Sequence, residues 1–198
     1  MQNKLTINRI AKISILAVIA YIFMFFEFPL PFIAPPFYKI DFSEVVVMIG
    51  GFALGPISAI VIEALKILLN LLFSGTDTMF IGELSNFIVG ISFVVPASLI
   101  YRKNKTKNQA IIGMVVGGIL MTIVGFITNL YAIIPAYVNI MGFESEMIIA
   151  MAREIFPFIN SMLMLVLCCT TPFNLIKATL VSIITAMLYK HISPIVKK

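Results

Sequence analysis

Residues 84–107 read LSNFIVGISFVVPASLIYRKNKTK and determine how the rest of the chain is interpreted. The first part, 84–101, contains no charged residue, and the part that follows contains Arg102, Lys103, Lys105 and Lys107. An uncharged helix of this length extends about 27 Å, close to the thickness of a bilayer's hydrocarbon core. Short loops rich in Lys and Arg are typical of the cytoplasmic side. The stretch therefore predicts a transmembrane helix that ends at the cytoplasmic face.

The composition extends this interpretation to the whole chain. Of 198 residues, 61% are hydrophobic and 12% are charged, and the mean hydropathy is +1.08. These values exclude an ordinary soluble domain and a disordered chain. About six spans of roughly 20 residues each would use most of the chain. We therefore expect one integral membrane domain, with no room for a soluble catalytic or nucleotide-binding domain.

Basic residues gather in three places, which predicts the topology. Besides the loop at 102–107, the clusters comprise Lys4, Arg9 and Lys12 near the start, and Lys190, Lys197 and Lys198 at the end. The positive-inside rule places all three clusters in the cytoplasm, so an even number of spans must separate them. The same rule explains the net charge of +5 without a nucleic-acid partner. The predicted fold is an all-α integral membrane protein with six transmembrane helices and both termini cytoplasmic.

The boundaries of the spans follow from this count and from the helix-breaking residues. Gly50, Gly51, Gly55 and Pro56 predict a break between two helices. Thr170, Thr171 and Pro172 resemble a helix start, with a hydroxyl cap before a proline in the first turn. The expected spans are about 10–28, 41–55, 57–73, 83–101, 109–131 and 172–190. The segments 29–43 and 139–171 become an outer lid loop and a long outer connection.

Two charged residues in the third span allow two interpretations. Glu63 and Lys66 lie three positions apart, on one face of a helix. They can form an internal ion pair, or one of them can face a ligand. A charged side chain within the bilayer costs about 2.5–3.5 kcal/mol on insertion scales. Charged residues at this depth are therefore candidate functional residues by default.

Polar residues in the other spans concentrate in the outer half of the bundle. Lys177 follows Asn174 by three positions on the expected sixth span, and no acid on that helix pairs with it. Lys177 either extends to the outer interface or contacts a ligand or partner inside the bundle. Asn129, Glu83 and Asn86 share its depth, although Glu83 also suits a helix N-terminus and the amides can bond neighbouring helices. Together they predict an outward-facing pocket whose amides both donate and accept hydrogen bonds, as a flat apolar ring with hydroxyls requires.

The loop at 29–43 is the expected lid over this pocket. Four prolines stiffen it, and Phe32, Phe37 and Tyr38 can cover a ligand. Lys39, Asp41 and Glu44 either contact the ligand's edge or are solvated rim charges. The glycine-rich stretch before Pro56 lacks the lysine of a phosphate-binding loop, and no nucleophile with an adjacent base is evident. The sequence therefore predicts a binding protein, not an enzyme.

Four segments resemble the riboflavin-specific S-component of energy-coupling-factor (ECF) vitamin transporters, and the spacing fits essentially the whole chain. The segments are Lys39-Ile40-Asp41-Phe42-Ser43-Glu44, Ile49 to Pro56, Gly82-Glu83-Leu84-Ser85-Asn86-Phe87 and Pro172-Phe173-Asn174-Leu175-Ile176-Lys177. The resemblance implies a six-helix fold in the cell membrane and riboflavin bound near the outer surface, under the lid. It implies that Asn174 and Lys177 contact the flavin or its ribityl chain, with Asn129 opposite. The full candidate set is Asn129, Asn174, Lys177, Glu83, Asn86, Asp41, Tyr38 and Lys66.

The resemblance also implies partners. An ECF transmembrane coupling protein and two cytoplasmic ATPase subunits would supply the energy. Family members dock the coupling protein through an Ala-x-x-x-Ala patch in the first helix, and this chain has Ala17 and Ala20 there. No resident cofactor or metal is expected, since riboflavin is cargo. The alternatives are an S-component for another vitamin or a flavin nucleotide, a self-sufficient carrier, which would need a polar path to the inner face, and a small membrane enzyme.

Overall fold

The structure, a computed structural model, describes residues 7–196, with side chains up to Tyr189. Lys4, Lys197 and Lys198 of the expected basic clusters lie outside the described residues, as does the side chain of Lys190. The long helices are α1 (Ile7–Phe25), α2 (Ser43–Leu54), α3 (Pro56–Phe73), α4 (Ile81–Lys103), α5 (Lys107–Thr128) and α9 (Thr171–Val196). The short elements are β1 (Phe28–Pro29), β2 (Lys39–Ile40), η1 (Asn129–Ile133), α6 (Ile134–Asn139), α7 (Ser145–Arg153), α8 (Met162–Leu165) and η2 (Val166–Thr170).

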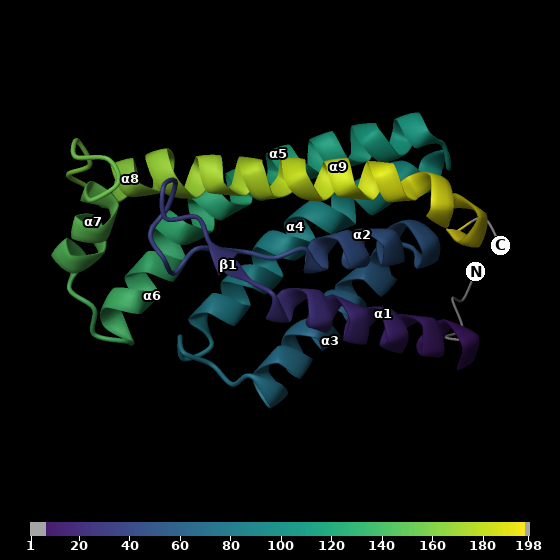
Figure 1. Cartoon of the computed structure of the whole chain (residues 1–198), viewed down its shortest axis with the longest axis horizontal. Helices are drawn as coiled ribbons and strands as arrows, with labels where there is room; N and C mark the ends of the chain where they lie inside the picture. Colours follow the sequence, from purple (N-terminus) through teal and green to yellow (C-terminus); the bar gives the residue numbers. More distant parts are fainter. Residues whose placement is uncertain (1–6, 197–198) are drawn as a thin grey trace.

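Successive long helices run in opposite directions, which gathers the basic segments at one end. Figure 1 shows the start of α1, the turn between α4 and α5 and the last turns of α9 at the same end of the molecule. This end is called the basic end below. The short elements α6, α7 and α8 lie at the opposite end, called the cavity end. The described parts of the three basic clusters therefore lie at one end of the molecule.

The structure is that of an all-α membrane protein. Within residues 7–196, five helical stretches are long and apolar enough to cross a bilayer, and α2 is a shorter apolar helix. Large aliphatic side chains point outward along these helices, among them Ile22, Leu72, Ile119 and Ile183. Such a surface requires an apolar solvent.

The break between α2 and α3 uses the expected glycine and proline. Gly55 has a φ of +95° and Pro56 begins α3, so the chain reverses within a single residue. The guanidinium of Arg9 donates a hydrogen bond of 2.8 Å to the carbonyl of Leu54, at the end of α2, and another to Ser58. One cation of the basic end therefore stabilises this turn.

The last helix begins earlier than the sequence indicated. The expected start was at Pro172, but helix runs without interruption from Met162 through α8 and η2 into α9. In η2 the amide of Thr171 bonds to the carbonyl of Val166, five residues back. This wider π-helical turn lets the helix pass through Pro172, which has no N–H to donate. The expected connection 139–171 therefore shrinks, and residues 162–171 belong to the helix.

The fifth helix is extended in the same way. It was expected to end near residue 131, but η1 and α6 continue it to Asn139. The amide of Ile134 bonds to the carbonyl of Asn129, again five residues back, immediately before Pro135. Both helices therefore carry a π segment near the cavity end.

Glycines bring α4 and α5 into close contact. A methyl group on Gly117 would lie 2.4 Å from the carbonyl oxygen of Phe93, and one on Gly113 would lie 2.7 Å from that of Ala97. The sequence Gly113-x-x-x-Gly117 therefore packs within the molecule, in the manner of small-residue contacts between membrane helices.

We expect Gly117→Ala to lower the melting temperature in detergent, because the added methyl must push two helix backbones apart at a cost of about 1–3 kcal/mol. Val115→Ile, on the same helix, also adds one carbon, but Val115 points outward. This control should melt like the parent protein. Equal melting temperatures for all three proteins would contradict the packing described here.

Candidate functional site

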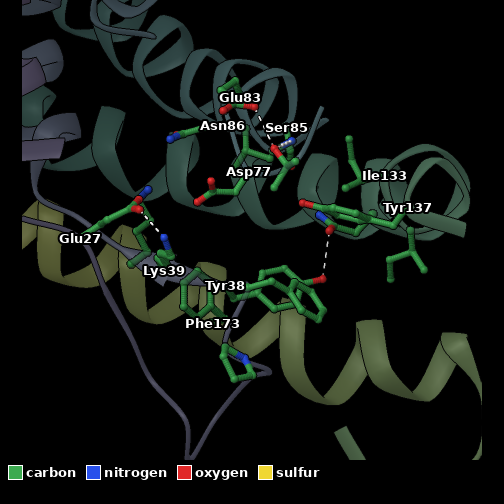
Figure 2. Close-up of a pocket in the computed structure, with 18 of the residues that line it drawn as sticks. Glu27, Tyr38, Lys39, Asp77, Glu83, Ser85, Asn86, Ile133, Tyr137 and Phe173 are labelled. Carbon is green, nitrogen blue, oxygen red and sulfur yellow. Dashed lines mark hydrogen bonds and ion pairs between the residues drawn. The ribbon is translucent and has the colours of Figure 1, made fainter. Parts of the chain in front are cut away.

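A cavity of about 620 Å³ opens at the cavity end. Its walls come from the loop between α1 and α2, the end of α3, the first turns of α4, the η1–α6–α7 region and the first turns of α9. In Figure 2, Asp77, Glu83, Ser85 and Asn86 lie across the cavity from Tyr38 and Phe173. The volume lies within the range of small-molecule sites, about 300–1,000 Å³.

Six of the eight predicted binding residues line this cavity. These are Tyr38, Glu83, Asn86, Asn129, Asn174 and Lys177. The other two, Asp41 and Lys66, are buried beside the cavity and contact residues that line it. The fold therefore brings together residues from positions 38 to 177 at one place.

Tyr38 fastens the loop to both π segments. Its hydroxyl donates to Oδ1 of Asn129, at 3.0 Å, and pairs with Oγ1 of Thr170, at 2.7 Å. Asn129 begins η1 and Thr170 ends η2. Burial raises the pKa of the Tyr38 phenol, although the hydrogen bond to Thr170 partly offsets this effect. The phenol is therefore neutral at physiological pH and can act as both donor and acceptor.

The two asparagines differ in how their amides are used. The amide nitrogen of Asn129 donates to the carbonyl of Gly125, at 2.8 Å. The amide nitrogen of Asn174 is buried and has no partner among the described residues. A methyl group on Gly125 would lie 2.2 Å from that nitrogen, so only glycine leaves room for it. Asn174 therefore offers a buried donor beside the cavity, and a buried donor without a partner costs about 1–3 kcal/mol until a ligand satisfies it.

Lys177 is neutralised by an acid from a distant part of the chain. Its Nζ lies 2.9 Å from Oδ2 of Asp41, and the other oxygen of Asp41 accepts from the amide of Ser43 at 2.8 Å. Burial alone would raise the pKa of Asp41, but the ammonium groups of Lys177 and Lys66, with the Ser43 hydrogen bond, lower it to about 2. Lys177 is only 6% exposed, so it does not extend to an interface.

Lys66 forms the internal ion pair that was one of its two interpretations. Its Nζ lies 2.7 Å from Oε1 of Glu63 and 3.0 Å from Oε1 of Glu44. Glu44 lines the cavity and is fully buried. It is therefore not the solvated rim charge that the sequence allowed, and it is the acid that joins the cavity wall to Lys66.

Aromatic side chains form apolar walls that the sequence only partly predicted. The rings of Tyr38 and Phe173 have centroids 5.5 Å apart, and those of Phe37 and Tyr137 are 6.0 Å apart. Tyr137, Met147 and Met151 also line the cavity. These three residues were not predicted, because no motif marks them and residues 139–171 were expected to form an outer connection.

The rim of the cavity carries one ion pair and one hydrogen-bonded carboxylate. Lys39 lies 2.5 Å from Glu27, with both side chains partly exposed. Glu83 accepts a hydrogen bond of 2.9 Å from the hydroxyl of Thr78. Both Lys39 and Lys177 are therefore neutralised by carboxylates, and the cavity suits a ligand without net charge better than an anion.

Ala17 and Ala20 are not available at the surface. They are 1% and 0% exposed and belong to the core near the basic end. The outward face of α1 carries Ile15, Val18, Ile19 and Ile22 instead. In this conformation the two alanines pack inside the molecule, where a partner subunit cannot reach them.

Comparison with known proteins gives a consistent result. Residues 8–189 match the family described as "ECF transporter, substrate-specific component". The riboflavin transporter RibU of Staphylococcus aureus (strain TCH60) is 32% identical, over 100% of this chain and 94% of its own length. The riboflavin transporter FmnP of Bacillus subtilis (strain 168) is 26% identical, over 95% of this chain and 93% of its own.

A solved structure of the S component of a bacterial ECF transporter is similar throughout. It superposes with a TM-score of 0.76 and 31% identity, over 96% of this chain and 98% of the other. The family match covers the helices that line the cavity as well as those that face lipid. The chain therefore belongs to the family of substrate-specific components of ECF transporters.

Proposed function

We propose that this protein captures riboflavin in the cavity and delivers it for uptake by an energising module shared with other S-components. The observation that carries the proposal is the buried, unpartnered amide of Asn174 beside an aromatic-walled cavity of about 620 Å³. Riboflavin has an apolar ring system with polar edges and a hydroxylated chain, and such a ligand requires both kinds of surface. The relatives named riboflavin transporters support the choice of ligand.

Each part of the cavity has a role in this proposal. Tyr38, Phe173 and Tyr137 flank the ring, and Asn129 and Asn174 bond its edge or the ribityl hydroxyls. Lys177 stays paired with Asp41 and presents its remaining N–H groups to the ligand. Glu83 and Asn86 lie on the opposite wall. Glu83 accepts hydrogen bonds from the ribityl hydroxyls, and Asn86 donates hydrogen bonds to them or accepts hydrogen bonds from them.

The topology and the partners complete the proposal. The basic end faces the cytoplasm, in accordance with the positive-inside rule, and the cavity opens outside the cell. The chain crosses the cell membrane six times, and α2 is the shortest crossing. A transmembrane coupling protein and two cytoplasmic ATPase subunits supply the energy, since this chain has no phosphate-binding loop.

A fluorescence titration tests the ligand directly. Riboflavin added to the purified, ligand-free protein in detergent should show saturable quenching at a one-to-one ratio. Absence of quenching in protein that melts cooperatively would contradict the proposed ligand. In that case, the thermal shift produced by other vitamins and by flavin nucleotides is measured, and the compound that raises the melting temperature is identified as the ligand.

We expect Asn174→Ala to weaken riboflavin binding at least tenfold, which corresponds to about 1.4 kcal/mol. The variant removes a lining amide nitrogen that is buried and has no partner among the described residues. Leu175→Ala is the matched control, because Leu175 is the next residue of α9 and points outward. Unchanged affinity in Asn174→Ala, measured by the same titration, would show that the ligand does not contact this amide.

We expect Tyr38→Phe to raise the dissociation rate of riboflavin more than its association rate. The variant removes both hydrogen bonds that fasten the loop over the cavity, a loss of about 1–3 kcal/mol. Stopped-flow fluorescence measures both rates. Tyr131→Phe makes the same chemical change at a residue that points outward and should leave both rates unchanged. A dissociation rate equal to that of the parent protein would show that Tyr38 does not retain the ligand.

A further inference from the structure

Five charged side chains form a buried cluster beneath the cavity. The buried charge cluster comprises Asp41, Glu44, Glu63, Lys66 and Lys177. Glu63 and Lys66 are 0% exposed, and Glu44 and Lys177 line the cavity. The cluster therefore lies between the cavity and the apolar core of the basic end.

The hydrogen-bond donors of the cluster are fully used around Lys66. Its ammonium has three N–H groups, and they reach Oγ of Ser43 at 3.0 Å, Oε1 of Glu44 at 3.0 Å and Oε1 of Glu63 at 2.7 Å. The hydroxyl of Ser43 donates in turn to Asp41. Neither donor can therefore serve another carboxylate oxygen.

Two buried carboxylate oxygens consequently have no partner among the described residues. They are Oε2 of Glu44 and Oε2 of Glu63. The two carboxylates adjoin each other against the bare backbone of α4, since a methyl group on Gly90 would lie 2.6 Å from Oε1 of Glu63 and 3.0 Å from Oε1 of Glu44. A buried carboxylate oxygen without a donor is expensive, and neither Lys66, Ser43 nor Lys177 donates to these two oxygens in this arrangement.

The charge of the cluster shows the same deficit. Three carboxylates and two ammonium groups give a net charge of −1 when all are ionised. Among the described residues, the ion pairs of these five side chains are made only within the cluster, and the neighbouring helices add no charge beside it, since α1 has no charged residue after Lys12 and α4 has none between Glu83 and Arg102. An unbalanced charge in a low-dielectric interior is usually neutralised by binding a proton.

We propose that the buried charge cluster binds one proton, carried by the Oε2 atom of Glu63. A proton there removes the net charge and turns one of the two unpartnered acceptors into a donor. Glu44 lies in the first turn of α2, where the helix dipole favours the ionised form. Glu63 lies within α3 and receives no such stabilisation. This site is independent of the identity of the cavity's ligand.

Infrared spectroscopy of the ligand-free protein in detergent at pH 7 tests the proposal. Solvated carboxyl groups are ionised at this pH, so only a buried acid produces the C=O stretch of a protonated carboxyl, which shifts in D₂O. We expect this band in the parent protein and its loss in Glu63→Gln. We also expect its loss in Glu44→Gln, because removal of one acid leaves two carboxylates for two ammonium groups and Glu63 then ionises.

Glu27→Gln is the control, since Glu27 is partly exposed and paired with Lys39, and it should retain the band. Absence of the band in the parent protein, or its persistence in either Glu63→Gln or Glu44→Gln, would overturn the proposal. Melting temperatures measured in sodium chloride and in choline chloride test whether a sodium ion, instead of a proton, occupies the buried charge cluster. A sodium-specific rise in a protein without the band would assign the site to a metal cation instead.

Discussion

The ion pair between Lys177 and Asp41 joins parts of the chain that are 136 positions apart, and the cavity depends on it. Asp41 lies two residues before the start of α2 and Lys177 lies on α9, so the pair fixes the end of the loop against the last helix. Through Ser43, Asp41 also reaches Lys66 on α3. Charged side chains are costly in lipid, so the helices pack with these charges buried between them. Lys177 belongs both to this buried pair and to the wall of the cavity.

Glycines without side chains leave room for these polar groups between closely packed helices. Gly90 lies against the carboxylates of Glu63 and Glu44, and Gly125 lies against the amide of Asn174. At both positions a side chain would occupy the space that a functional group now fills. The glycines therefore serve the site as well as the packing, because they let charged and amide groups sit between helices without separating them.

The polar residues of the candidate site could be predicted from the sequence, but the helix extensions that form its walls could not. Asn174 and Lys177 share a helix face by spacing, and the structure places both on the cavity together with Asn129, Glu83, Asn86 and Tyr38. The partner of Lys177 could not be read from periodicity, because Asp41 is distant in the chain. The π segments before Pro135 and Pro172 were also beyond reach, since proline ordinarily ends or begins a helix. Ala17 and Ala20 were placed by motif, and motif spacing does not show which face of a helix is buried.

The apolar interior of the basic end explains why capture and translocation must be separate steps. Below the buried charge cluster, Met48, Phe93, Ala97 and Val181 pack into one hydrophobic core, with exposed fractions near zero. A ligand with several hydroxyl groups would lose its hydrogen bonds in such a core. A bound ligand therefore cannot pass through the helices while they hold this arrangement. Translocation therefore requires movement of the whole protein or a change in its packing, which is the step that the proposed energising module would drive.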